Sequence, residues 1–441
     1  MNEIYDVTGK RELFIDTFLI DRMRNVCLSP HYPVEMPSSP TKPGGAYVTV
    51  MKTPQKYWLF YRDTDKVYQG EMCNNHPGEY VGVAQSDDGI SWSLPKLDRF
   101  PGKPVPANTL IYGKEAITHN FVPFYDTNPA CRPAERYKAV AGVRETNGLF
   151  AFHSPDGLNW RPYGKAPIIA YDPEKNGGHM LDSQNVVFYS VCEQCYVMYI
   201  RVWMTAEGFD HLRSFAKVTS NDFLHWSEPE YLSVNRKGEH LYVSGLAPYV
   251  RAPHIYVGAA TRYFGDRGSA TDVTLLFSRN GRGITRPSPG AWIRPGLDPE
   301  RWQNRMNYIA WGMVQKGENE LIMYHNRKPL MYIFRTDGFV SLSSVGLKTG
   351  AILTNVLSRR RGGLEFNLST SAGGYIQVEI CDENGLPLPG FSFKEMKPFW
   401  GDAIRWEPDW NGRRFSELPP MRFRMRIKMK ECDLYSVHFP E

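Results

Sequence analysis

The stretch Met180–Arg201, MLDSQNVVFYSVCEQCYVMYIR, contains two segments rich in β-branched and aromatic residues, joined by a short polar turn. Such residues favour β-strands over helices. The first expected strand closes at Phe188, and the second runs from Tyr196 to Ile200. Asp182 stands at the head of the first strand and Arg201 at the end of the second. This stretch predicts a β-hairpin that begins beside a carboxylate.

The same unit recurs along the chain. Strand pairs repeat with a period of roughly 60–80 residues, which is typical of propeller blades with about four strands each. The expected first strands are Tyr47–Met51, Asn120–Phe124, Gln184–Phe188, Leu246–Val250 and Ile309–Val314. The expected second strands begin at Tyr57, Tyr137, Tyr196, Tyr256 and near Leu321.

A turn motif repeats in phase with these strands. It reads SDDGISW at 86–92, SPDGLNW at 154–160 and SNDFLHW at 220–226, with a degraded copy, SRNGRGI, at 278–284. The three tryptophans are 68 and 66 residues apart. Asp and Gly suit a tight turn, and the Trp anchors the returning strand. The regular spacing supports a repeat of equivalent sheets.

These patterns predict an all-β protein, a five-bladed β-propeller followed by a C-terminal β-sandwich. Residues 11–20, RELFIDTFLI, are expected to form a strand, and its part Leu13–Ile20 is expected to join the last blade and close the ring, which removes the exposed sheet edges. A change of composition near Gly346 leads into alternating strands with hairpin turns such as Glu383-Asn384-Gly385. The expected domains are therefore the propeller at 1–345 and the sandwich at 346–441.

Composition excludes several classes of function. The net charge of +5 is spread along the chain, so nucleic acid is not an expected partner. The chain contains no run of about 18 apolar residues, so no membrane span is predicted. The N-terminus lacks an apolar signal core, which predicts a cytoplasmic protein, or a secreted or periplasmic one whose signal peptide has been removed. Cys192 and Cys195 form a lone CxxC on a turn, for which a structural role is favoured over a metal site.

The chain resembles glycoside hydrolase family 32, its furanosidase relatives and uncharacterised bacterial proteins grouped with that family. The strings that carry the resemblance are LFIDTFLI (13–20), NFVPFYDTNPA (120–130), LDSQNVVFY (181–189) and SNDFLHWSEP (220–229). The turn motif is also similar to the Asp-boxes of sialidases, which have six blades. The resemblance implies a carbohydrate substrate and no cofactor.

In family 32 the first strands of blades one, two and three each supply one catalytic acid. The resemblance places Asp182 in the third of these positions, where the family has its general acid. The second position falls at His119-Asn120 and the first near Ala46-Tyr47, and neither pair contains a carboxylate. The resemblance therefore supplies one acid of three, and the others must come from elsewhere in the chain.

Glycosidic hydrolysis generally needs two carboxyl groups across the scissile bond. Asp182 is the first candidate, and a structural hydrogen bond to a neighbouring blade is its alternative role. Asp63 and Glu115 rank next, because each flanks the start of a first strand. The remaining acids considered are Glu71, Glu207, Asp210 and Asp266, which are more typical of solvated loops.

Arginine recurs where second strands end, at Arg62, Arg201 and Arg262, with Arg327 nearby in blade five. If these side chains reach one depth, they form a ring suited to a carboxylate or sulfate. Pairing of each Arg with a nearby acid is the alternative. The full set of expected substrate-binding residues is His119, Asn120, Gln184, Arg62, Arg201, Arg262, Arg305, His325 and Trp203.

The predicted function is a glycoside hydrolase that acts on a glycan or oligosaccharide in the central pocket by carboxylate acid/base chemistry. A furanoside and an acidic sugar are the sugar types considered. A non-catalytic carbohydrate-binding propeller is the alternative from another class, and a phosphorolytic or lyase-like enzyme is a further one. The sugar, the linkage, the stereochemical outcome and the oligomeric state are left open.

Overall fold

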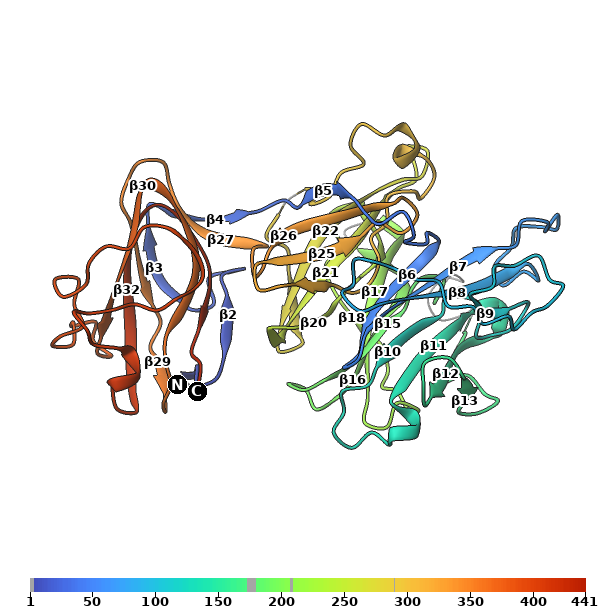
Figure 1. Ribbon diagram of the computed structural model, residues 1–441, viewed down its shortest axis with the longest axis horizontal. Helices are drawn as coiled ribbons and strands as arrows, with labels where there is room; N and C mark the ends of the chain where they lie inside the picture. Colours follow the sequence, from blue (N-terminus) through green and yellow to red (C-terminus); the bar gives the residue numbers. More distant parts are fainter. Residues whose placement is uncertain (1–3, 173–179, 207–208, 289) are drawn as a thin grey trace. The chain divides into compact units, whose positions relative to one another are not determined.

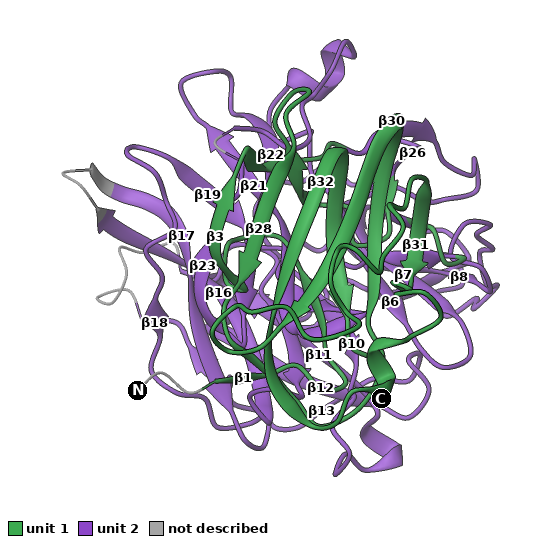
Figure 2. Ribbon diagram, turned by 90° about the vertical axis from the view of Figure 1, so that its left-hand side faces the viewer, with its two compact units in different colours: residues 1–32, 317–320, 334–441 green, residues 33–316, 321–333 purple. Residues whose placement is uncertain are grey.

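The structure is a computed structural model that describes residues 4–172, 180–206, 209–288 and 290–441 (Figure 1). The described chain consists of β-strands, loops and 3-10 helices of three or four residues. It forms two compact units, coloured separately in Figure 2. Unit 1 comprises residues 1–32, 317–320 and 334–441, and unit 2 comprises residues 33–316 and 321–333.

Unit 2 contains five sheets of four or five strands that follow one another along the chain as blades. Blade 1 consists of β6 (Ala46–Lys52), β7 (Tyr57–Thr64), β8 (Glu79–Ser86) and β9 (Thr109–Tyr112). Blade 2 consists of β10 (Val122–Tyr125), β11 (Tyr137–Val143), β12 (Gly148–Ser154), β13 (Arg161–Pro162) and β14 (Ile169–Ala170). Blade 3 consists of β15 (Val186–Ser190), β16 (Cys195–Ala206), β17 (Phe209–Ser220) and β18 (Glu230–Tyr231).

Blade 4 consists of β19 (His240–Val243), β20 (Ala247–Tyr249), β21 (Ala252–Phe264), β22 (Ala270–Arg279) and β23 (Arg282–Thr285). Blade 5 consists of β24 (Val314–Lys316), β25 (Glu320–Tyr324), β26 (Leu330–Arg335) and β5 (Val34–Pro37). The all-β class, the five blades and an additional C-terminal sheet are therefore confirmed. The expected first strand of blade 5 is shorter than predicted, since Ile309 makes only an isolated bridge to His325.

The predicted closing strand was wrong. The strand that completes blade 5 is β5, which pairs antiparallel with β26 from Val34 opposite Ile333 to Pro37 opposite Leu330. Residues 11–20 are not one strand either. Arg11–Leu13 forms β2, which pairs with the C-terminal strand of unit 1, and Asp16 lies in the bend that follows. Residues 1–32, expected in the propeller domain, thus fall in unit 1.

Unit 1 is a ten-stranded sheet built around its own apolar core. Its N-terminal strands are β1 (Tyr5–Asp6), β2, β3 (Ile20–Arg24) and β4 (Val26–Pro30). Its C-terminal strands are β27 (Val340–Ser344), β28 (Gly350–Thr354), β29 (Leu357–Arg359), β30 (Glu365–Cys381), β31 (Asp402–Trp406) and β32 (Met421–His438). Phe423, Met425 and Ile427 of β32 are buried, whereas the Arg and Lys residues between them are half-buried or exposed. The expected half-buried alternation is confirmed.

The turn motif closes three blades in one way. It follows the third strand of blades 1, 2 and 3, and the Asp carboxylate accepts two backbone N–H groups further along the turn. The distances are 2.7 and 2.7 Å for Asp88, 2.9 and 2.7 Å for Asp156, and 2.9 and 2.8 Å for Asp222. In the third copy Phe223 replaces Gly and holds φ at +71°, a conformation that its full burial between aromatic rings stabilises.

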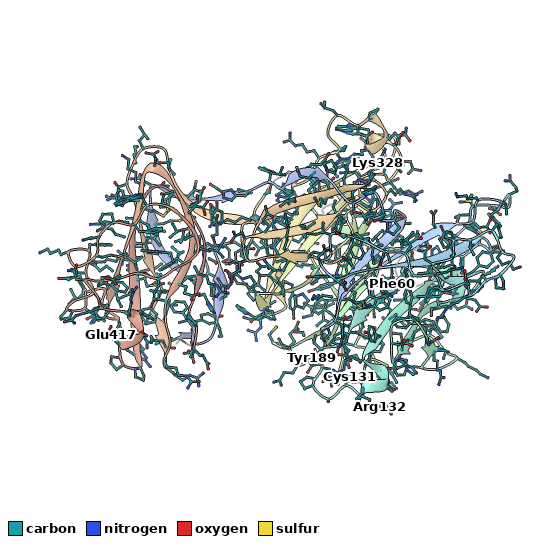
Figure 3. The ribbon with its side chains drawn as sticks, in the orientation of Figure 1. Phe60, Cys131, Arg132, Tyr189, Lys328 and Glu417 are labelled. Carbon is teal, nitrogen blue, oxygen red and sulfur yellow. The ribbon has the colours of Figure 1, made fainter. Side chains whose placement is uncertain are left out.

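Adjacent blades pack through large apolar side chains. Phe60 of β7, labelled in Figure 3, lies in a buried cluster with Phe121 and Ala139 of blade 2. A second cluster joins Val50 of blade 1 to Ile322 of blade 5. These interfaces hold the blades in fixed positions and thereby fix the residues at the starts of the first strands.

The turn carboxylates predict an acid-sensitive contribution to stability. Burial alone would raise the pKa of Asp88, but the N–H groups of Ser91 and Ile90 outweigh it and lower the pKa to about 2. Because the folded pKa lies below the unfolded value of about 3.9, the contribution is complete above pH 4 and is lost as the pH falls towards 2. Asp88→Ala should lower the free energy of unfolding by about 1 kcal/mol at pH 7, and by much less at pH 2.

Urea unfolding of wild type and variant at a series of pH values measures this difference. Asp87→Ala, at the exposed neighbouring position, is the control and should change stability by less than about 0.5 kcal/mol. A difference for Asp88→Ala that stays constant from pH 7 to pH 2 contradicts the prediction.

Candidate functional site

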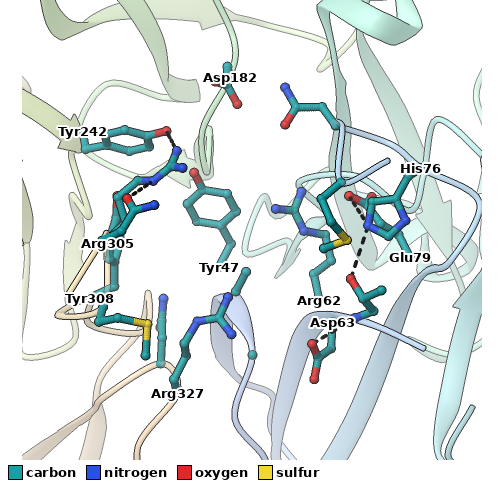
Figure 4. Close-up of a pocket in the computed structure, with 18 of the residues that line it drawn as sticks. Tyr47, Arg62, Asp63, His76, Glu79, Asp182, Tyr242, Arg305, Tyr308 and Arg327 are labelled. Carbon is teal, nitrogen blue, oxygen red and sulfur yellow. Dashed lines mark hydrogen bonds and ion pairs between the residues drawn. The ribbon is translucent and has the colours of Figure 1, made fainter. Parts of the chain in front are cut away.

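A polar cavity of about 350 Å³ lies in unit 2 near the starts of the first strands of the blades (Figure 4). Four blades contribute polar side chains to its wall. Blade 1 gives Tyr47, Arg62, Asp63, Thr64, His76 and Glu79, blade 3 gives Asp182, blade 4 gives Tyr242, and blade 5 gives Arg305, Tyr308, Asn326 and Arg327. The blades thus bring together residues that are up to 280 positions apart in the sequence.

The backbone around the cavity adopts left-handed conformations at residues other than glycine. Tyr47 has φ +49°, Leu181 +70° and Arg305 +53°, and Asn120 beside the cavity has +56°. For a bulky residue such as Tyr this conformation is a marked outlier, and such strain concentrates at functional sites. In blade 3 the unusual turn at Leu181 directly precedes Asp182.

Asp182 presents its carboxylate to the cavity. Its backbone carbonyl accepts a hydrogen bond from Nη1 of Arg201 at 3.3 Å. The carboxylate itself makes no hydrogen bond or ion pair with the part of the chain that the structure describes. Arg201 is buried, and its guanidinium carbon lies 4.4 Å from the ring centroid of Tyr242. Asp182 is therefore half-buried, close to cations, and unpaired.

A chain of polar contacts at the cavity wall connects blades 1 and 2. Glu79 Oε2 lies 2.8 Å from Nδ1 of His119, and Nη1 of Arg62 lies 2.9 Å from both Nε2 of His119 and Oδ1 of Asn120. Burial favours a protonated Glu79, but the His119 hydrogen bond and the Arg62 charge outweigh it and lower its pKa. Burial and then Arg62 lower the pKa of His119.

Nδ1 of His119 also accepts the backbone N–H of Asn75 at 3.0 Å and lies 2.7 Å from Nη1 of Arg62, so the ring is held between the Glu79 carboxylate and two donors. The position that the family resemblance assigns to a second acid thus orients an arginine at the cavity wall. Glu79 is engaged with His119 and is not available for acid/base work on a ligand.

Three tyrosines form the aromatic part of the wall. The ring of Tyr308 contacts those of Tyr47 and Tyr242, with centroids 6.2 and 5.8 Å apart. Burial, then Tyr242 and Asp182, raise the pKa of Tyr47 well above its usual value. The guanidinium carbon of Arg62 lies 5.2 Å from the centroid of the Tyr47 ring. Tyr47 therefore keeps its proton and can act as a hydrogen-bond donor.

The structure brings five of the residues expected from the sequence into this cavity: Asp182, Asp63, Arg62, Arg305 and Arg327. Asp63 accepts a hydrogen bond from the backbone N–H of Thr64 at 2.9 Å. Glu115 is exposed and is not part of the cavity wall. Glu207 and the side chain of Asp210 lie outside the described residues.

The other expected binding residues are engaged within the fold. Gln184 donates to Oγ1 of Thr49 at 3.0 Å, which connects blade 3 to blade 1. Trp203 stacks on the guanidinium of Arg213 at 4.6 Å. Nδ1 of His325 accepts the backbone N–H of Lys328 at 3.0 Å, and burial, then Arg301, lower its pKa to about 3.

The expected arginine ring is incomplete. Arg62 and Arg327 line the cavity, and Arg201 lies buried beside it. Arg262 instead makes a bidentate ion pair with Asp272, with both N–O distances 2.6 Å. For Arg262 the alternative expectation, pairing with a nearby acid, is therefore confirmed.

Sequence reasoning overlooked Tyr47, Tyr308 and Glu79. Tyr47 occupies the blade 1 position where family 32 has an acid and this chain has none. The sequence therefore indicated its location near the cavity but not its role as an aromatic hydrogen-bond donor. Tyr308 lies between Arg305, an expected binding residue, and Ile309, where the first strand of blade 5 was expected to begin. Glu79 begins a third strand and carries no distinguishing signal in the sequence.

No group of three or more His, Cys, Asp or Glu residues that could hold a metal occurs among the described residues. No described helix is long and apolar enough to cross a membrane. Cys192 and Cys195 are free thiols, and Cys192 contacts the hydroxyl of Tyr256 at 3.3 Å.

No protein-family model matches the chain, and no curated protein matches it either. Solved structures do align with it. One is a family 43 arabinoxylan arabinofuranohydrolase from Bacillus subtilis, with 10% identity over 90% of this chain and 96% of that one, at a TM-score of 0.44. Another is a β-1,2-mannobiose phosphorylase from Listeria innocua, with 12% identity over 71% and 97%, at a TM-score of 0.46.

A third is a glycosidase-like protein from Bacteroides thetaiotaomicron, with 12% identity over 74% of this chain and 96% of that one, at a TM-score of 0.43. The chain thus resembles, distantly and in fold, glycosidases and glycoside phosphorylases. Membership of family 32 stays a prediction.

The buried Glu79–His119 contact predicts a measurable contribution to stability. Glu79→Gln keeps the shape of the side chain but removes the charge that His119 and Arg62 face. The free energy of unfolding should fall by about 1 to 2 kcal/mol, the difference between a charged and a neutral buried hydrogen bond. Urea unfolding at pH 7 measures it.

Glu115→Gln is the matched control, since Glu115 is exposed, and its effect should stay within about 0.5 kcal/mol. Equal stabilities for the two variants would show that the Glu79 charge is not part of the contact.

Proposed function

We propose that the protein is a glycoside hydrolase and that the cavity in unit 2 is its active site. A volume of about 350 Å³ is in the range of small-molecule sites, and the wall combines carboxylates, guanidinium groups and aromatic rings. Such a mixture suits a sugar, which offers hydroxyl groups at its edges and apolar C–H faces to aromatic rings.

The carboxylate of Asp182 is the observation that carries the proposal. Two acids of unit 2 outside the cavity are paired: buried Asp126 accepts from Lys138 at 2.6 Å, and half-buried Glu239 is held by Arg286. Keeping a half-buried carboxylate without a partner costs free energy unless the group is used. Asp182 is such a group, and it faces the cavity.

Asp182 and Asp63 divide the chemistry. Asp182, when protonated, donates its proton to the glycosidic oxygen as the bond to the anomeric carbon breaks, and the electron pair of that bond leaves with the oxygen. Asp63 then acts at the anomeric carbon, either by attacking it or by taking a proton from the attacking water. These are the retaining and the inverting routes.

One observation favours a second candidate, a carbohydrate-binding propeller without catalysis. The two further positions where family 32 carries acids hold Tyr47 and the His119–Asn120 pair, and those residues orient one another and Arg62. A site with this composition can bind a sugar without cleaving it.

A panel of aryl glycosides and of neutral and acidic oligosaccharides, assayed with and without inorganic phosphate, tests the proposal. We expect release of reducing sugar in the absence of phosphate. Asp182→Asn should lower kcat by about 10²- to 10⁴-fold, the usual contribution of general acid–base catalysis. Asp63→Asn should lower it to a similar extent.

Asp87→Asn makes the same substitution at an exposed turn of blade 1 and should leave kcat unchanged. Cleavage by Asp182→Asn at the wild-type rate would remove Asp182 from the mechanism. Cleavage only with phosphate would indicate phosphorolysis, and binding without cleavage would indicate the carbohydrate-binding propeller.

A further inference from the structure

Three arginines of the cavity wall have no acidic partner. Arg62, Arg305 and Arg327 make no ion pair within the described part of the chain. Other arginines of unit 2 are paired with acids, such as Arg262 with Asp272 and Arg286 with Glu239. The cavity therefore holds cations that the fold itself does not neutralise.

Two of these cations share one wall. Blade 5 contributes Arg305 and Arg327, on the left and lower left in Figure 4, and no carboxylate among the described wall residues. The acids of the wall come from other blades: Asp63 and Glu79 from blade 1, and Asp182 from blade 3. The blade 5 wall is thus positively charged, although the cavity as a whole carries both signs.

The same wall has a buried donor without an acceptor. Tyr308 is 7% exposed, and its hydroxyl has no hydrogen-bond partner in the structure. Burial, then the neighbouring Tyr47, raise the pKa of Tyr308 well above its usual value, so the hydroxyl keeps its proton. A buried hydroxyl without a partner costs free energy, which a ligand oxygen would recover.

It also has a buried acceptor without a donor. Asn326 is 3% exposed, and its side-chain oxygen is unpartnered. The backbone N–H of Asn326 donates to the carbonyl oxygen of Tyr308 at 3.0 Å, so the two residues are held side by side. The wall therefore offers, within one small area, two guanidinium groups, one hydroxyl donor and one amide acceptor.

We propose that the blade 5 wall binds the carboxylate of an acidic sugar, and that the substrate of the glycosidase proposed above is a glycan containing uronic acid. A planar carboxylate matches the fork of a guanidinium group and accepts a further hydrogen bond from a hydroxyl such as that of Tyr308. A sugar hydroxyl on the same ring supplies the donor that Asn326 lacks. This inference names the substrate class and rests on the proposed function for the site's chemistry.

Binding can be measured without cleavage in the Asp182→Asn variant by titration calorimetry. The ligands are short oligosaccharides from galacturonan, alginate, glucuronoxylan and hyaluronan, each beside its carboxyl-reduced counterpart. We expect at least one acidic oligosaccharide to bind roughly tenfold or more tightly than its reduced form, the usual strength of one charged hydrogen bond.

Variants of the wall test its residues one by one in that background. Arg305→Gln and Arg327→Gln should each weaken binding of the acidic oligosaccharide roughly tenfold to hundredfold and change binding of the reduced form little. Tyr308→Phe removes only the unpartnered hydroxyl, so the fold is kept and selective weakening reports on the ligand. Arg161→Gln, at an exposed position on the outer strand β13 of blade 2, is the matched control and should bind as its parent does.

Equal binding of acidic and reduced forms across the panel, or unchanged binding in the three wall variants, would overturn the inference. A sulfated oligosaccharide that contains no uronic acid is a further ligand in the same titrations. Binding of the sulfated form, but of no uronate, through the same residues would overturn the assignment to a carboxylate. Cleavage of neutral glycans with no preference for acids would overturn this inference and leave the proposed hydrolase standing, whereas selective uronate binding without cleavage would do the reverse.

Discussion

The ring of unit 2 depends on four backbone pairs between β5 and β26, which join Val34–Pro37 to Leu330–Ile333. These pairs close the long loop of chain between residues 37 and 330, which costs on the order of 5 kcal/mol in chain entropy. The cost is offset where blade 5 meets blade 1. There Val48 and Val50 pack with Ile322, and the backbone of Trp311 accepts from Val50 at 2.7 Å and donates to Val48 at 2.9 Å. Without β5, strand β26 would be left as an open edge of the last blade.

Closure also determines which residues can meet. Tyr47 lies in β6, the first strand of blade 1, which ring closure brings next to blade 5. Its ring therefore reaches Tyr308, although the two residues are 261 positions apart. The left-handed backbone at Tyr47 and Arg305 is tolerated because packing on both sides determines those positions. The interfaces between blades therefore stabilise strained residues at the cavity that would relax in an isolated hairpin.

The repeat, the blade count and the position of Asp182 were predictable, because each rests on local pattern: strand periodicity, a turn motif, and a carboxylate before an apolar run. The closing strand was not. Residues 11–13 and 20–24 do form strands, but these strands belong to unit 1, whereas all four residues of the true closing strand β5 are exposed. Arginine partners also depend on register. Arg262 lies opposite Asp272 and pairs with it, whereas Arg62 lies opposite Val81 and is left for His119 and Asn120.

Opposite charges in the cavity are kept apart by the fold. Arg62 is held by His119 and Asn120, Arg305 by Asn304 and the hydroxyl of Tyr242, and neither reaches Asp182 in an ion pair. In a flexible loop such groups would collapse onto one another, because a partly buried ion pair is favoured over two separate buried charges. Since each group belongs to a different blade and the ring cannot contract, the separation persists. Charges held in place before a ligand arrives are what stabilise a polar transition state, as they need no reorganisation during the reaction. The closed ring thus explains how Asp182 stays unpaired, which is the arrangement that the proposed hydrolysis requires.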